Sequence, residues 1–221
     1  MKEIFVVGTW LLTPERVLQT KNTIAQIKSM GFPVCMVAHC PAPTELQEMV
    51  DYFIYEKENV LSTDFRLTFV QETNGVRREK VSEVGYHAVA CLMNIRNAVD
   101  ILLAQGHYTH MHYIEADIVT DLLRYAAVAG HILKTVKACF IQDPGLHPGY
   151  RTDLFSAELL WYTTAIPRVR SWEEYVLGSV SSKLFLEQWI LPYVVADALP
   201  LPNFPVKNMF TQSDYGVRWD E

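Results

Sequence analysis

Residues 3–16 read EIFVVGTWLLTPER and decide how the chain begins to fold. The apolar run Glu3–Val7 predicts a strand that ends at Gly8-Thr9. Thr13-Pro14 is a typical helix start, because threonine caps a helix well and proline is favoured at its first position. Apolar residues at helical spacing follow, and Gly31 is expected to end the helix. A buried strand that leads directly into a helix is the repeating unit of a parallel sheet.

The same alternation continues to residue 142. Further strands are expected at Pro33–His39, Tyr52–Tyr55, Tyr108–Ala116 and Ala138–Gln142, and helices at Thr44–Val50, His87–Gln105 and Thr120–Lys137. Thr44 and Gln47 resemble a capping box at the start of the short helix. Residues 57–86 interrupt the pattern, and a long excursion of this kind is usually mobile or functional. The alternation predicts an α/β fold with a mostly parallel, Rossmann-like sheet flanked by helices.

The chain after residue 142 follows a different pattern. It contains a turn-rich loop (143–149), an apolar extended segment (Thr152–Thr163), a last helix (Ser182–Tyr193) and a proline-rich extended arm (Leu199–Pro205). We therefore expect a single domain in two parts, an α/β part at 1–142 and a smaller C-terminal part with its arm at 143–221.

Composition excludes several classes of protein. The 221 residues are 50% apolar, and a chain with this much apolar surface is not disordered. A formal net charge of -6 argues against nucleic-acid binding, which needs clustered Lys and Arg. No stretch reaches the roughly 18 apolar residues of a membrane span, and the N-terminus shows no secretory signal. The four cysteines form no disulfide framework, so we expect buried free thiols and a cytoplasmic protein.

In open α/β sheets, ligands bind outside the carboxyl ends of the strands. The residues that this rule selects are Thr9, Trp10, His39, Glu56, Glu115 and Asp117. The last two belong to HMHYIEAD at 110–117, and alternation along a strand points both carboxylates to one face. Two desolvated carboxylates repel each other, and Mg²⁺ or Mn²⁺, which prefer oxygen ligands, would relieve this repulsion. If the strand instead ends at Ala116, both acids are simply solvated.

Arg96 and Asn97 lie on the preceding helix, and the sequence leaves their role open. They could face the crevice and bind phosphate oxygens, as a planar guanidinium does well. Arg96 could equally form an ordinary ion pair with Asp100, one helical turn later.

The histidines allow a competing interpretation. His110 and His112 together with His39 would suit a zinc ion, although the sequence has neither a Cys-x-x-Cys nor a His-Glu-x-x-His motif. The glycine-rich dinucleotide and P-loop motifs and the hydrolase nucleophile elbow are also absent from the sequence.

The stretch NIRNAVDILLAQGHY at 94–108, followed by IEAD at 114–117, resembles the nucleotide-sugar-dependent glycosyltransferases of the GT-A fold. Their inverting family-2-like group carries an A-R-N-x-G…A-x-G…D-x-D pattern in the same order. The order of elements matches over about residues 2–142, and the motif match is specific over 94–117. The chain departs from the pattern where Glu115 replaces the first Asp, Ala98-Val99 replaces a small residue plus glycine, and His39-Cys40 replaces an acidic pair that reads uracil.

The resemblance implies a GT-A type fold and a metal-dependent glycosyltransferase that uses Mn²⁺ or Mg²⁺. Residues 1–142 would bind a nucleoside diphosphate sugar, and residues 143–221 would form the side that binds a glycan or another hydroxyl acceptor. The implied roles are metal binding by Asp117, a ribose or metal contact by Glu115, nucleotide binding by Arg96 and Asn97, and the border of the base by Thr9, Trp10 and His39. A further domain or a second chain could complete the small acceptor side.

A general base for the acceptor hydroxyl is expected in the second half of the chain. Glu187 ranks first because it lies in an otherwise apolar helix, and Asp153 and Glu158 follow. The aromatic residues of this half fit a core better than a sugar platform: Trp161, Tyr162 and Trp172.

Two other functions stay open. One is a non-catalytic nucleotide-sugar-binding or scaffold domain, in which the fold persists without a competent base. The other is a nucleotidyltransferase, which would normally need a glycine-rich loop with Lys or Arg that residues 8–13 lack.

Overall fold

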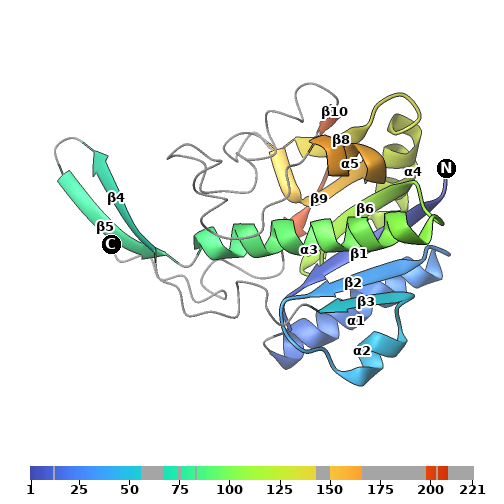
Figure 1. The fold of residues 1–221 in the computed structure, drawn as a ribbon, viewed down its shortest axis with the longest axis horizontal. Coiled ribbons are helices and arrows are strands. Elements are labelled where there is room, and N and C mark those ends of the chain that lie inside the picture. Colours follow the sequence, from blue (N-terminus) through green and yellow to red (C-terminus); the bar gives the residue numbers. More distant parts are fainter. Residues whose placement is uncertain are drawn as a thin grey trace.

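The structure is a computed structural model that describes residues 1–11, 13–55, 67–73, 76–82, 84–142, 150–165, 198–202 and 204–208. Figure 1 shows a central sheet with helices packed against it. The helices are α1 (Pro14–Ser29), α2 (Thr44–Glu48), α3 (Val84–Gln105), α4 (Leu122–Ile132) and α5 (Leu159–Ala165). The strands of the sheet are β1 (Glu3–Thr9), β2 (Val34–Ala38), β3 (Tyr52–Tyr55), β6 (His110–Glu115), β8 (Ala138–Gln142), β9 (Tyr150–Glu158) and β10 (Ala198–Pro202).

The seven strands of this sheet lie in the order β10-β8-β9-β6-β1-β2-β3. Neighbouring strands are parallel except around β9, which runs antiparallel to both β6 and β8. The central strand β1 aligns Gly8 with Glu115 of β6, and Thr9 with Ala38 of β2. The carboxyl ends of β1, β2 and β6 therefore meet at one edge. The predicted mostly parallel α/β sheet is confirmed.

Hydrophobic residues cover the sheet on both faces. One face packs against α3 and α5 through residues such as Val6 and Tyr113, and the other packs against α1, α2 and α4 through residues such as Phe5 and Ile114. Residues 4–7 of β1 are completely buried because helices cover both faces of this strand. A strand buried in this way has a continuous apolar sequence rather than an alternating one.

Two small antiparallel ribbons lie outside the main sheet. β4 (Leu67–Thr73) pairs with β5 (Val76–Ser82) inside the predicted excursion, and Figure 1 shows this hairpin extending away from the sheet. β7 (Ile118–Val119) follows the end of β6 and pairs with β11 (Lys207–Asn208). The second ribbon thus joins the C-terminal segment to the edge where the candidate acids lie.

The start of α1 and the C-terminal ends of α1 and α3 follow their sequence signals. α3 begins at Val84 rather than at the predicted His87, and α4 is shorter than the predicted helix at Thr120–Lys137. The Thr13 hydroxyl accepts a hydrogen bond of 3.4 Å from the backbone N–H of Arg16, and Pro14 is the first residue of α1. Gly31 and Gly106, after α1 and α3, have φ angles of 83° and 67°, which glycine adopts without strain.

The short helix α2 differs from its prediction. Thr44 is its first residue rather than its cap, and Pro43 holds the cap position without a side-chain hydrogen bond. The predicted capping box is therefore wrong, because the chain enters the helix one residue earlier than the motif requires.

The C-terminal part also differs from the predicted pattern. The segment 152–163 is not extended throughout, because β9 ends at Glu158 and α5 begins at Leu159. Trp161 and Tyr162 of this helix pack with α3 in the hydrophobic core, a long-range contact that an apolar sequence alone does not reveal. The proline-rich arm contributes β10, an edge strand, where proline is tolerated. The loop at 143–149 and the helix at 182–193 lie outside the described residues.

The sheet takes strands from both predicted parts of the chain, since β8 ends at Gln142 and β9 begins at Tyr150. The four cysteines are free, as predicted, and all but the half-buried Cys40 are fully buried. Within the described ranges, no helix combines the length and the apolar character that crossing a bilayer requires.

A buried polar cluster lies between β6, β9 and α4. Nδ1 of His112 lies 2.7 Å from Oγ of Ser156, which in turn lies 2.7 Å from the hydroxyl of Tyr125. Nε2 of His112 lies 3.8 Å from Oε1 of Glu3, which is too long for a hydrogen bond. Burial lowers the pKa of His112 to about 3, helped by the nearby His110, and burial raises the pKa of Glu3.

We predict that His112 makes the folded protein less stable as the pH is lowered. The pKa of this imidazole is about 6.5 in the unfolded chain and about 3 in the folded protein. Between these values the unfolded chain binds a proton that the folded protein does not bind, so the free energy of unfolding decreases as the pH falls from about 6.5 to about 3. The loss is about 1.4 kcal/mol per pH unit, partly offset by the raised pKa of Glu3. Urea unfolding of the wild type and of His112→Gln across this range measures it.

The slope of stability against pH should be shallower in His112→Gln than in the wild type. His107→Gln is the matched control, because His107 is exposed on the surface. Equal slopes for the wild type and His112→Gln would contradict the prediction.

Gly8 lies where the backbone of β1 passes the buried ring of Tyr113. A Cβ atom added at Gly8 would overlap the Tyr113 hydroxyl. We predict that Gly8→Ala destabilises the fold by about 1–3 kcal/mol, as overpacking of a core does. Adding Tyr113→Phe to this variant should recover part of the loss, because it removes the overlapped oxygen. Denaturant unfolding of the two single variants and the double variant tests this, and additive losses would contradict it.

Candidate functional site

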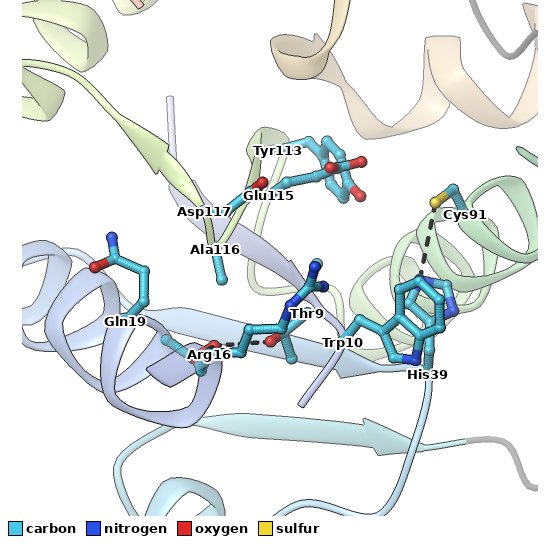
Figure 2. Close-up of a pocket in the computed structure, with 12 residues that line it drawn as sticks. Thr9, Trp10, Arg16, Gln19, His39, Cys91, Tyr113, Glu115, Ala116 and Asp117 are labelled. Atoms are coloured by element: carbon cyan, nitrogen blue, oxygen red, sulfur yellow. Dashed lines mark hydrogen bonds between the residues drawn. The ribbon is translucent and has the colours of Figure 1, made fainter. Parts of the chain in front are cut away.

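A pocket opens at the carboxyl edge of the sheet, outside the ends of β1, β2 and β6 (Figure 2). It encloses about 400 Å³ of empty space, part of which is open to solvent. Its walls come from β1, α1, β2, α3, β6 and the turn after β6. The lining residues are Gly8, Thr9, Trp10, Arg16, Gln19, Thr20, His39, Cys91, Tyr113, Glu115, Ala116 and Asp117.

The two acids of the IEAD sequence both line this pocket. Glu115 is the last residue of β6 and is half-buried, whereas Asp117 lies in the turn before β7 and is only 8% exposed. The backbone N–H of Ala116 donates to the carbonyl of Gly8 at 2.9 Å, and the Thr23 hydroxyl donates to the Ala116 carbonyl at 3.1 Å. These two bonds tie the turn to β1 and α1, so Asp117 faces the pocket rather than open water.

Tyr113 forms the floor beneath these acids. Its ring is buried, and burial raises the pKa of its hydroxyl well above the usual value, with a further rise from the charge of Glu115. The hydroxyl is therefore protonated at neutral pH and is a neutral group next to Gly8.

The oxygen atoms of Glu115 and Asp117 suit a hard divalent cation. Mg²⁺ is usually bound by one or two carboxylates, with substrate phosphates and water filling the other positions. Among the described residues, no group of three or more His, Cys, Asp or Glu is arranged to hold a metal ion. Two carboxylates alone would leave most coordination positions of such a cation to a ligand or to water.

The alternative zinc site is wrong for a topological reason. His110 is the first residue of β6 and pairs with Glu3 at the start of β1. His39 directly follows β2 and therefore lies at the opposite, carboxyl end of these parallel strands. His112 is fully buried between them and bonded to Ser156. Parallel strands keep the first and last residues of a strand apart, so these histidines cannot share one ion.

His39 lines the pocket and is held from behind by α3. The amide nitrogen of Asn94 lies 3.0 Å from Nδ1 and 3.3 Å from Nε2 of the imidazole, and Sγ of Cys91 lies 3.8 Å from Nε2. Trp10 lines the same pocket. Sequence reasoning selected Trp10 and His39 but missed Asn94, whose partner is more than fifty residues away in the chain.

Arg96 and Asn97 do not line the pocket. Arg96 forms the ion pair with Asp100, Nε to Oδ1 at 2.9 Å, and donates a second hydrogen bond of 3.1 Å to the carbonyl of Thr163 in α5. The helix turns about 100° per residue, so Arg96 points roughly away from Asn94. The structure therefore has the ion-pair arrangement, and nucleotide binding by Arg96 or Asn97 stays a prediction that no contact supports.

Arg16 is the pocket residue that sequence reasoning missed. It lies in the first turn of α1, is 7% exposed, and places its Cζ 5.6 Å from the centre of the Trp10 ring. The Thr20 hydroxyl donates to the Arg16 carbonyl at 2.8 Å and lies 2.8 Å from the Thr9 hydroxyl, which fixes α1 against β1. A cation at a helix N-terminus opposes the helix dipole, and that unfavourable placement was the available signal.

Of the three residues predicted as the general base, Asp153 and Glu158 lie at opposite ends of strand β9. Asp153 precedes Leu154, the partner of Ile114, on β9 and therefore lies toward the pocket end of the sheet, although it is not one of the residues that line the pocket. Both of its carboxylate oxygens are bound by Arg151. Glu158 lies at the opposite end of β9, paired with Lys137 at 2.7 Å, so its placement does not suit a base for this pocket. Glu187 lies outside the described residues.

The aromatic residues of the second half behave as expected of a core. Trp161 and Tyr162 are buried in the cluster formed with α3, and Trp172 lies outside the described residues.

No family model and no curated protein sequence matches the chain. Solved structures do match. A protein described as a nucleotide-diphospho-sugar transferase from Desulfovibrio desulfuricans G20 aligns with a TM-score of 0.51 at 9% identity, covering 91% of this chain and 80% of its own. A glycosyltransferase involved in glycosylation of the major capsid of PBCV-1 aligns with a TM-score of 0.53 at 6% identity, covering 96% of both chains.

A third similar structure is 4-diphosphocytidyl-2C-methyl-D-erythritol synthase from Anaerococcus prevotii DSM 20548. It aligns with a TM-score of 0.52 at 10% identity, covering 97% of this chain and 95% of its own. At such low identity these likenesses concern the fold. The order of strands, the antiparallel β9 and these three similar structures together show that the chain has a Rossmann-like α/β fold of the GT-A type.

Proposed function

We propose that the protein is a metal-dependent glycosyltransferase that moves a sugar from a nucleoside diphosphate sugar to a hydroxyl of a glycan or related acceptor. The observation that supports this most is that Glu115 and Asp117 both line the pocket at the carboxyl ends of the strands of a GT-A type sheet. Two similar structures are described as a nucleotide-diphospho-sugar transferase and a glycosyltransferase, which makes a nucleotide sugar the first choice of donor.

The nucleoside would bind at the β1 and β2 side of the pocket. Trp10 offers an aromatic ring on which a base can stack, and Thr9 and His39 supply polar groups beside it. His39 is restrained by Asn94 and Cys91, so the wall it forms is preorganised. Preorganised groups bind with less loss of conformational entropy.

The diphosphate would lie beside Glu115 and Asp117, which would hold a Mn²⁺ or Mg²⁺ ion between them and the phosphate oxygens. Such an ion, when bound, neutralises the charge that develops on the departing diphosphate. The two side chains would orient the diphosphate of the donor.

Within the part of the chain that the structure describes, Asp153 is the candidate for the general base that accepts the proton of the acceptor hydroxyl. The hydroxyl oxygen would then bond to the anomeric carbon while the bond from that carbon to the diphosphate oxygen breaks. The bidentate contact with Arg151 fixes the orientation of this carboxylate. Glu187 is the other candidate, and a second chain or domain could supply the remaining acceptor contacts.

A nucleotidyltransferase is the second candidate function, favoured by one observation. The similar structure from Anaerococcus prevotii is a diphosphocytidyl-methylerythritol synthase, and the pocket contains the basic side chain of Arg16. Incorporation of label from a nucleoside triphosphate would support this candidate, whereas slow hydrolysis of a nucleoside diphosphate sugar would support the glycosyltransferase. A protein that binds the donor but never turns it over would be the non-catalytic domain.

We predict that Asp117→Asn weakens Mn²⁺-dependent binding of nucleoside diphosphates by tenfold or more, about 1.4 kcal/mol, because it removes one charged oxygen ligand. Isothermal titration of the wild type and the variant, with Mn²⁺ and with EDTA, measures this. Glu45→Gln on the exposed surface of α2 is the control and should bind as the wild type does. Unchanged Mn²⁺-dependent binding in Asp117→Asn would rule out the proposed metal site.

We predict that Asp153→Asn lowers kcat for sugar transfer or donor hydrolysis by about 10² to 10⁴, the usual contribution of a general base, with donor affinity unchanged. Glu158→Gln is the control, because Glu158 lies on the same strand but at the end far from the pocket, and it should keep the wild-type rate. A rate that is lost equally in both variants, or in neither, would show that Asp153 is not the base.

A further inference from the structure

We propose that Arg16 is the residue that recognises the diphosphate of the bound nucleotide. This assignment rests on the proposed function, because it names the group of this chain that meets the phosphates in the same pocket.

The first support is the position of the side chain. Arg16 is almost completely buried and lines the same pocket as Glu115 and Asp117. In the view of Figure 2, its guanidinium reaches from α1 past Thr9 into the space between Trp10 and the two acids. A nucleotide whose base lies at Trp10 and whose phosphates lie at the acids must pass this group.

The second support is the state of the α1 N-terminus, where backbone N–H groups often bind phosphate. Pro14 has no N–H, and the N–H of Arg16 is bonded to the Thr13 hydroxyl at 3.4 Å. The Glu15 carboxylate accepts its own backbone N–H and a bond from Thr13, which lowers the pKa of Glu15. These amides are occupied, so a phosphate contact from this turn would have to come from a side chain.

The third support is the balance of charge. Glu115 and Asp117 contribute two negative charges, and a divalent cation between them would leave no net charge to attract a diphosphate. The guanidinium of Arg16 adds one positive charge to the same pocket. A planar guanidinium also binds two phosphate oxygens at once, and it does so more strongly where water is excluded.

Arg16 could instead serve only as a structural counter-ion for the two acids. The two roles differ in one measurable respect. A structural cation affects every ligand of the pocket alike, whereas a phosphate-binding cation affects only the part of the affinity that the phosphates contribute.

Titration calorimetry with nucleosides, nucleoside monophosphates and nucleoside diphosphates of all four bases, in Mn²⁺ and in EDTA, separates these roles. For Arg16→Gln we expect diphosphate affinity to fall on the order of tenfold to a hundredfold, with nucleoside affinity within about twofold of the wild type. Arg16→Lys keeps the charge without the planar fork and should lose several-fold. Arg124→Gln, which removes an exposed arginine of α4, should change neither.

Equal losses for nucleosides and diphosphates, or no loss for either, would overturn the assignment of Arg16. If Arg16→Gln fails to fold by circular dichroism, the Arg16→Lys comparison decides by the same criterion. If the wild type binds diphosphates more tightly than nucleosides and Arg16→Gln keeps this preference, the assignment of Arg16 is wrong but the proposed function is not affected. A wild type that binds no nucleoside diphosphate overturns the proposed function and this inference together.

Discussion

The parallel pairing of β1 with β2 on one side and β6 on the other is the constraint on which the pocket depends. Residues 4–7 of β1 are completely buried, so a shift of register would place apolar side chains against the wrong neighbours. The observed register aligns Gly8 with Glu115 and Thr9 with Ala38. Chemistry-bearing residues from three distant stretches of sequence meet because these three strands end at the same level.

Two helices on opposite faces of the sheet complete the site. α3 places Asn94 and Cys91 behind His39, and α1 places Arg16 beside Trp10. Both helices are followed by glycines with positive φ, and the buried residues described on each pack against the sheet, which sets their positions. Groups held in this way lose little entropy when a ligand binds.

The antiparallel strand β9 gives the second half of the chain its place in the site. It lies in the sheet between β6 and β8, with Asp153 toward the end of the strands where the pocket opens and Glu158 at the opposite end. Two acids only five residues apart thus lie in different environments. The interior beneath them carries the buried cluster around His112, whose polar atoms are shielded from water by Phe5 and Phe32.

The sequence by itself determined the class of fold, the strands β1, β3 and β8, the start of α1, the C-terminal ends of α1 and α3, and the position of Glu115 and Asp117 at the end of a strand. Local periodicity, caps and strand-end acids are short-range signals. Only the tertiary structure decided that Arg96 pairs with Asp100 and Thr163, that Asn94 holds His39, and that Arg16 enters the pocket. The direction in which a helical side chain points depends on which face of the helix packs against the sheet. That choice is made by contacts between residues far apart in the chain, which spacing within one helix does not encode.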